Sequence, residues 1–121
     1  AWESCLEKNQ NICEKSSLKC AKCVELKQLD YNSQKIILKN ICNFSCNLDD
    51  WEIKDEGRKT FVFDDFFLNP YSEASIVVGN ETDTQNPNTL YWEKETYVWT
   101  ESGDSLFLRD PAGKLVLWES Y

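Results

Sequence analysis

A β-hairpin is predicted by the stretch Trp99-Thr-Glu-Ser-Gly-Asp-Ser-Leu-Phe-Leu-Arg-Asp-Pro-Ala-Gly-Lys-Leu-Val-Leu-Trp-Glu-Ser-Tyr121. Apolar runs at 106–108 and 115–118 flank Asp110-Pro-Ala-Gly113, where proline presets a turn and glycine accepts a positive φ. A hairpin closed symmetrically about this turn has two apolar faces, which is typical of a central strand pair. The partners are then Leu108 with Leu115, Leu106 with Leu117, and Phe107 with Val116.

Strand patterns also precede the hairpin. Trp51 and Ile53 alternate with Glu52 and Lys54, as in a half-buried strand. Other strand-like runs are 23–29, 34–42, 60–64 and 74–79, and the segments 90–92 and 97–99 lead back to the hairpin. Short strands separated by turns, without helical periodicity, predict an all-β sandwich of immunoglobulin-like kind.

Length and charge restrict the class of protein. The 121 residues suit one domain, with a Cys-rich extension at 1–22 that is too poor in apolar residues to fold alone, and a sandwich at 23–121. The net charge of -8 disfavours direct nucleic-acid binding. No apolar run is long enough to span a membrane, and no leader resembles a signal peptide. Because the chain begins at Ala1, we expect a mature protein or part of a larger polypeptide.

Six cysteines in a short chain without histidine favour disulfides, and hence an extracellular or cell-surface location. A hairpin about Asn32–Ser33 brings the cysteines that flank it together, at separations that a disulfide can bridge. The expected pairs are Cys23 with Cys42, Cys20 with Cys46, and Cys5 with Cys13.

The same spacing allows an alternative. Cys20-x-x-Cys23 and Cys42-x-x-x-Cys46 are two short-spaced pairs of the kind that form four-cysteine zinc sites. Such a site is closed and therefore structural. Our main expectation remains disulfides, with no metal and no cofactor.

Other motifs concern the surface. Asn43-Phe-Ser and Asn80-Glu-Thr make Asn43 and Asn80 glycosylation candidates. The polar segment 80–88 is the loop that we expect to carry function.

Catalytic patterns are weak in this sequence. Without histidine, the usual Cys-His and Ser-His-Asp mechanisms are excluded. The pairs Asp49/Asp50 and Asp64/Asp65 are compatible with glycoside hydrolysis or calcium binding. The favoured interpretation is that they are solvated acids at strand ends.

Aromatic residues supply the candidate binding positions. An aromatic platform for a sugar or peptide is possible, made of Tyr91, Trp92, Tyr97, Trp99 and Trp118. Core packing is the favoured role for Trp51, Trp92 and Trp99. On the second face of the hairpin, Phe107, Val116 and Trp118 belong either to the core or to an exposed apolar patch for another domain or protein. The candidate binding residues are Tyr91, Tyr97, Phe107 and Trp118.

A set of motifs runs through residues 23–121: the strand 35–40, Leu48-x-x-Trp51-x-Ile53-x-Asp55, Thr60-Phe-Val-Phe63, Leu68-x-Pro70, 76–78, Val98-Trp99, Gly103-Asp104-x-Leu106-x-Leu108-x-Asp110, Gly113-x-Leu115-Val116 and Ser120-Tyr121. With these motifs the segment resembles a lamin tail domain, the immunoglobulin-like module of nuclear lamins and of secreted or surface proteins of bacteria and archaea. The resemblance departs at Asp50, where the family usually has glycine before the tryptophan, and at Tyr71, where glycine usually follows proline.

The resemblance implies an accessory module without catalytic residues, which targets or tethers a larger protein, often beside nuclease or other hydrolase domains. We therefore expect a non-catalytic extracellular module that mediates protein–protein or cell-surface attachment. The alternative is a module that recruits polysaccharide or nucleic acid for an attached hydrolase or nuclease.

Overall fold

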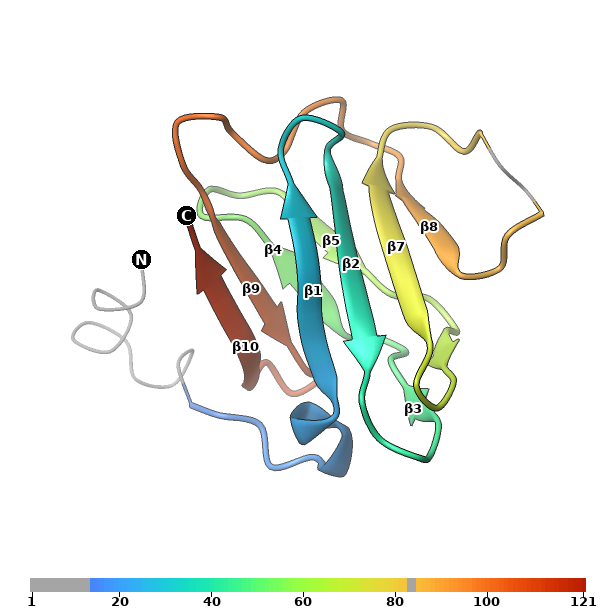
Figure 1. Cartoon of the computed structure of the whole chain (residues 1–121). Helices are drawn as coiled ribbons and strands as arrows, with labels where there is room; N and C mark the ends of the chain where they lie inside the picture. The colour runs from blue at the N-terminus through green and yellow to red at the C-terminus, as the bar shows by residue number, and fades with distance from the viewer. Residues whose placement is uncertain (1–13, 83–84) are drawn as a thin grey trace.

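The computed structural model describes residues 14–82 and 85–121, which form two facing four-stranded sheets and a small two-stranded sheet at one end (Figure 1). The first sheet has the order β1-β2-β7-β8, and the second has the order β10-β9-β4-β5. The elements are the 3₁₀ helix η2 (Lys19–Lys22) and the strands β1 (Val24–Asp30), β2 (Lys35–Asn40), β3 (Cys46–Asn47), β4 (Glu52–Lys54), β5 (Thr60–Val62), β6 (Phe67–Leu68), β7 (Glu73–Val78), β8 (Thr89–Trp92), β9 (Ser105–Arg109) and β10 (Leu115–Ser120). The predicted all-β sandwich is confirmed.

The first sheet is built on the β1–β2 hairpin. β1, β2 and β7 are antiparallel, whereas β8 runs parallel to β7. Val24 pairs with Asn40, and the Ile41 N–H donates to the Cys23 carbonyl at 2.8 Å. The base of the hairpin therefore brings the cysteines of both strands together.

The second sheet contains the predicted alternating strand. In β4 and just before it, Trp51 and Ile53 are buried, while Glu52 and Lys54 are partly exposed. This prediction is confirmed, because the core-facing positions alternate with solvent-facing positions in a strand.

The terminal hairpin forms as β9 and β10, but its predicted pairing is wrong. Leu117 pairs with Leu108, and the register shifts between Leu115 and Leu117, where Val116 is an extra residue. The backbone N–H and carbonyl of Leu115 bond instead to residues 14 and 16. β9 is an inner strand, whereas β10 lies at the edge of its sheet, so the expectation of a central pair holds for β9 alone.

The core lies between the two sheets. Trp51, Trp92 and Trp99 are all buried there, as predicted, and the Trp92 and Trp99 rings meet edge to face at 6.0 Å. These large rings supply much of the apolar area that the domain removes from water. In the part of the chain that the structure describes, no helix is long and apolar enough to cross a membrane.

Candidate interaction surfaces

Two disulfides fasten the segment before β1 to the sandwich. Cys20, in η2, is bonded to Cys46 of β3, and Cys23 is bonded to Cys42 in the loop after β2. Their Cα atoms are 5.8 and 5.3 Å apart. These are the pairs that the hairpin geometry predicts, while Cys5 and Cys13 lie outside the described residues.

The alternative zinc site uses the same four cysteines. In the structure each sulfur is joined to another sulfur, and no described cysteine is a free thiol. Among the described residues, no group of three or more cysteine or acidic side chains is arranged to hold a metal ion. The arrangement is therefore that of two covalent cross-links.

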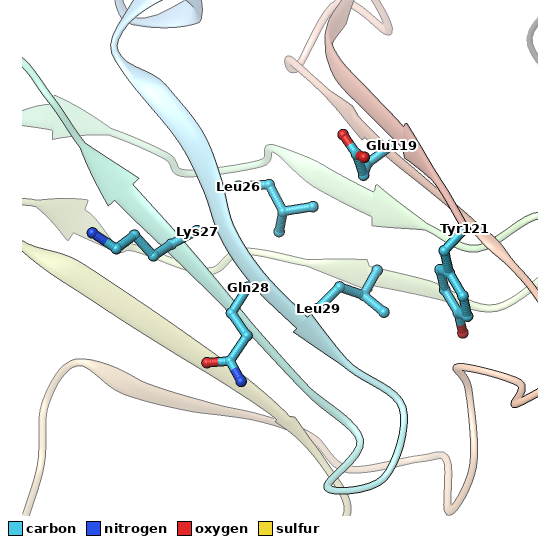
Figure 2. Close-up of a pocket in the computed structure, with 6 residues that line it drawn as sticks. All are labelled: Leu26, Lys27, Gln28, Leu29, Glu119 and Tyr121. Atoms are coloured by element: carbon cyan, nitrogen blue, oxygen red, sulfur yellow. The ribbon is translucent and has the colours of Figure 1, made fainter.

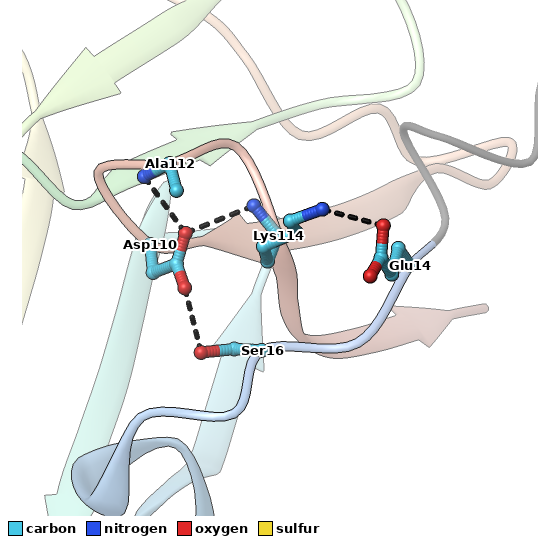
Figure 3. A network of polar contacts seen from close by, with 5 residues as sticks. All are labelled: Glu14, Ser16, Asp110, Ala112 and Lys114. Carbon is cyan, nitrogen blue, oxygen red and sulfur yellow. Dashed lines mark hydrogen bonds and ion pairs between the residues drawn. The ribbon is translucent and has the colours of Figure 1, made fainter.

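Asp110 fixes the β9–β10 turn and holds Ser16 against it (Figure 3). Its carboxylate accepts hydrogen bonds from the N–H groups of Ala112 and Lys114, each at 2.9 Å, and from the Ser16 hydroxyl at 2.7 Å. Lys114 also forms an ion pair with Glu14. Residues 14–16 thus lie beside Leu115, the first residue of β10. Lys15 and Leu115 form an isolated parallel β-bridge.

The aromatic residues that were predicted to bind do not form one platform. Tyr91 lies on β8 and Trp118 on β10, strands at opposite sides of the sandwich (Figure 1). Tyr97, which is 46% exposed, lies in the loop between β8 and β9, where its hydroxyl accepts from the Glu101 N–H at 3.2 Å. The five-ring platform is wrong for a second reason, because Trp92 and Trp99 are buried.

Phe107 and Trp118 pair across β9 and β10. Phe107 is only 8% exposed, and the Arg109 guanidinium lies 5.1 Å from the centre of its ring. Phe107 is therefore not part of an exposed patch, whereas Val116 and Trp118 are partly exposed. They line a groove of about 400 Å³ together with Lys15, Leu115 and Leu117.

A second groove separates β1 from β10, the edge strands on one side of the sandwich. Its volume is about 310 Å³, and Figure 2 shows Leu26 and Leu29 on the side of β1 that faces Tyr121. These two leucines share a face because the register of β1 shifts between Leu26 and Gln28. The other lining residues are Lys27, Gln28 and Glu119.

A third groove, which we call the β5–β8 groove, lies on the opposite side. Its volume is about 310 Å³, and residues distant in sequence form it: Phe61, Val62, Asp64, Glu81, Thr89, Leu90, Tyr91 and Glu93. Of the candidate binding residues, it contains Tyr91. Sequence reasoning missed the other members, because nothing in the chain marks β5 and β8 as neighbours.

The paired acids of the sequence have a local structural role. The Asp49 carboxylate accepts a hydrogen bond from the Asp65 N–H at 2.7 Å. Asp50 and Asp65 both have positive φ values, of 65° and 49°. Asp49 therefore caps a turn, and Asp50, Asp64 and Asp65 are exposed.

Two buried acids were not singled out by sequence analysis. Asp104 accepts from the N–H groups of Ser105 at 2.9 Å, Glu56 at 3.1 Å and Thr100 at 3.3 Å. Asp55 accepts from the Lys59 N–H at 3.0 Å, and burial, together with the charge of Asp104, raises its pKa. The sequence did contain an indication of their importance, because Asp55 and Asp104 both lie in motifs that resemble those of the lamin tail domain.

Both glycosylation candidates are sterically open. Asn43 lies in the loop between β2 and β3, and Asn80 follows β7; both are exposed. Part of the predicted functional loop, residues 83 and 84, lies outside the described residues.

Comparison with known proteins agrees with this architecture. A family model described as Lamin Tail Domain matches residues 20–121. The match starts before the predicted domain boundary at residue 23, and it includes Cys20 as well as Cys23. A search of curated proteins returned no match to the chain.

Proposed function

Because the chain belongs to the lamin tail domain family, we propose that it is a non-catalytic extracellular module that attaches a larger polypeptide to a protein or cell-surface partner. The pair of disulfides carries the extracellular part of this proposal. Structural disulfides form and persist in oxidising compartments. They also join η2 to β3, through Cys20 and Cys46, and the start of β1 to the loop after β2, through Cys23 and Cys42.

Three candidate contact residues support attachment. Tyr91, Tyr97 and Trp118 each expose part of an aromatic ring at a different place on the sandwich. Aromatic side chains combine a large apolar area with a polar atom, and they are enriched in protein interfaces. Phe107, the fourth candidate, supports Trp118 from the neighbouring strand.

Binding to intact cells of the source organism tests the proposal. The full chain, oxidised and fluorescently labelled, is expected to be retained on these cells, and Trp118→Ala or Tyr91→Ala is expected to reduce retention without lowering the unfolding midpoint. Absence of retention by the folded chain would contradict attachment, and hydrolysis of a polymer by the purified chain would contradict a non-catalytic role. Retention on immobilised polysaccharide or nucleic acid, lost in Tyr91→Ala or Tyr97→Ala, would support the alternative of substrate recruitment.

A further inference from the structure

We propose that the β5–β8 groove binds an extended basic segment of a partner protein, which joins the free edge of β5 as an added strand. This inference rests on the proposed function and names the chemistry of its partner. Strand addition draws affinity from backbone hydrogen bonds and specificity from alternate side chains.

The backbone of β5 presents a free edge to the groove. The Phe63 N–H donates to the Trp51 carbonyl at 2.9 Å, and Phe61 pairs with Ile53. Because the bonds of an antiparallel strand alternate in direction, the N–H and carbonyl of Val62 point away from β4. Within residues 14–82 and 85–121, β5 pairs with β4 alone.

Two other edge strands, β1 and β10, carry protection that β5 lacks. β1 has a register shift and a lysine at position 27, and the start of β10 is covered by residues 14–16. Bulges, charged side chains and covering segments are the usual means of blocking an edge. In β5 the outward side chains are those of Thr60 and Val62, both uncharged, and Val62 is 50% exposed.

The groove combines apolar and acidic residues. Phe61 and Leu90 line it and pack against the core, so a side chain directed between the sheets meets an apolar surface. Three carboxylates line it as well, those of Asp64, Glu81 and Glu93, and none of the eight lining residues is basic. A strand that alternates apolar and basic residues matches both features, since its side chains point to opposite sides.

Nuclear magnetic resonance titration of the full oxidised chain tests this proposal. The probe is a short capped peptide that alternates lysine and valine, and the comparison peptides alternate lysine with glycine and glutamate with valine. We expect the lysine–valine peptide to bind with amide shifts centred on residues 60–64 and 89–93, and to bind more weakly as salt rises. The other two peptides are expected to bind at least about tenfold more weakly.

Two variants separate edge pairing from charge. Val62→Pro removes the outward N–H and leaves the hydrogen bonds to β4, and the double variant Glu81→Lys with Glu93→Lys reverses charge without changing the backbone. Each is expected to weaken binding about tenfold. Glu119→Lys, in the β1–β10 groove, is the matched control and is expected to bind as the parent does. Thermal unfolding shows whether each variant is folded, and the charge variant remains informative if Val62→Pro does not fold.

Three results would overturn the proposal: equal binding of the lysine–glycine peptide, shifts centred on Phe107 and Trp118, or no binding of the lysine–valine peptide at millimolar concentration. None of these results bears on the proposed function, because that function is tested separately by retention on cells. If cells retain the chain and the peptide does not bind, only the groove assignment fails.

Discussion

The side chain of Gln34 bonds to the backbone of Trp99 as a neighbouring strand would. Its Nε2 donates to the Trp99 carbonyl at 2.7 Å, and its Oε1 accepts from the Trp99 N–H at 2.9 Å. The same carboxamide donates to the Tyr31 carbonyl and accepts from the Val98 N–H, both at 2.7 Å. One side chain in the β1–β2 turn therefore satisfies backbone groups of residues 98 and 99, which belong to no strand but bring Trp99 into the core.

Gln34→Ala and Gln34→Glu are expected to destabilise the fold. Alanine removes all four hydrogen bonds that the Gln34 carboxamide makes to backbone groups. Glutamate places a negatively charged carboxylate next to the carbonyl oxygens of Tyr31 and Trp99, which it repels. Each change is expected to lower the free energy of unfolding by about 2–4 kcal/mol. Urea denaturation measures it, with Gln28→Ala, an exposed residue of β1, as the control. An unchanged urea midpoint for Gln34→Ala would show that these bonds add nothing to stability.

Tyr71, which the sequence motifs mark as a departure from the glycine of lamin tail domains, has a backbone conformation that favours glycine. Its φ is 57°, a left-handed value that costs a residue with a side chain about 1–2 kcal/mol. The side chain is 62% exposed, so it contributes little packing. Tyr71→Gly is therefore expected to be more stable than Tyr71→Ala by about 1 kcal/mol. The two variants lack the same ring, and equal unfolding midpoints would contradict backbone strain at this position.

Sequence patterns predict those parts of the fold that depend on the alternation of apolar and polar residues along a strand. The burial of Trp51 and Ile53, and the meeting of Cys23 with Cys42, follow from strand periodicity and one short hairpin. The β9–β10 register could not be predicted from local patterns. Leu115 forms its backbone hydrogen bonds with residues 14 and 16, which lie about a hundred residues earlier in the chain. An extra residue in one strand shifts the cross-strand partner of every residue after it. Nothing in the sequence of residues 110–117 indicates that such a bulge occurs there.

The candidate site was only partly predictable for a related reason. Tyr91 was singled out as an exposed aromatic residue, but its neighbours in the groove come from β5 and from the loop after β7. The order of strands in each sheet places β5 opposite β8, and strand order depends on packing between the sheets. The acidic character of the groove therefore appears only in three dimensions.

Loss of the Cys23–Cys42 cross-link is expected to destabilise the domain. Replacing both residues by alanine frees a loop with a sequence separation of 19, and such cross-links contribute about 2–4 kcal/mol. Chemical denaturation of the oxidised parent and the double variant measures the difference. In the parent, thiol titration after unfolding is expected to find no reaction at Cys20, Cys23, Cys42 or Cys46. Stoichiometric zinc together with reactive thiols at these positions would support the zinc site instead.

Tyr121 is expected to ionise later than an ordinary tyrosine. Its hydroxyl donates to the Thr100 carbonyl at 2.6 Å, and its ring stacks on Tyr31 with centroids 6.0 Å apart. Burial, followed by the negative charge of Asp104, raises the pKa of Tyr121 from 10.0 to about 12.

The raised pKa of Tyr121 fixes the direction of a pH effect. The neutral phenol is favoured in the folded state, so its contribution to stability is fully present below pH 10 and is lost as the pH rises through about 12. Ultraviolet titration of the folded chain is expected to show one of its five tyrosines ionising near pH 12, and Tyr121→Phe is expected to remove that step. Tyr71→Phe, at an exposed ring, is the control and should leave the step in place. If the late step survives in Tyr121→Phe, it does not belong to Tyr121, and burial together with the charge of Asp104 does not hold this phenol neutral.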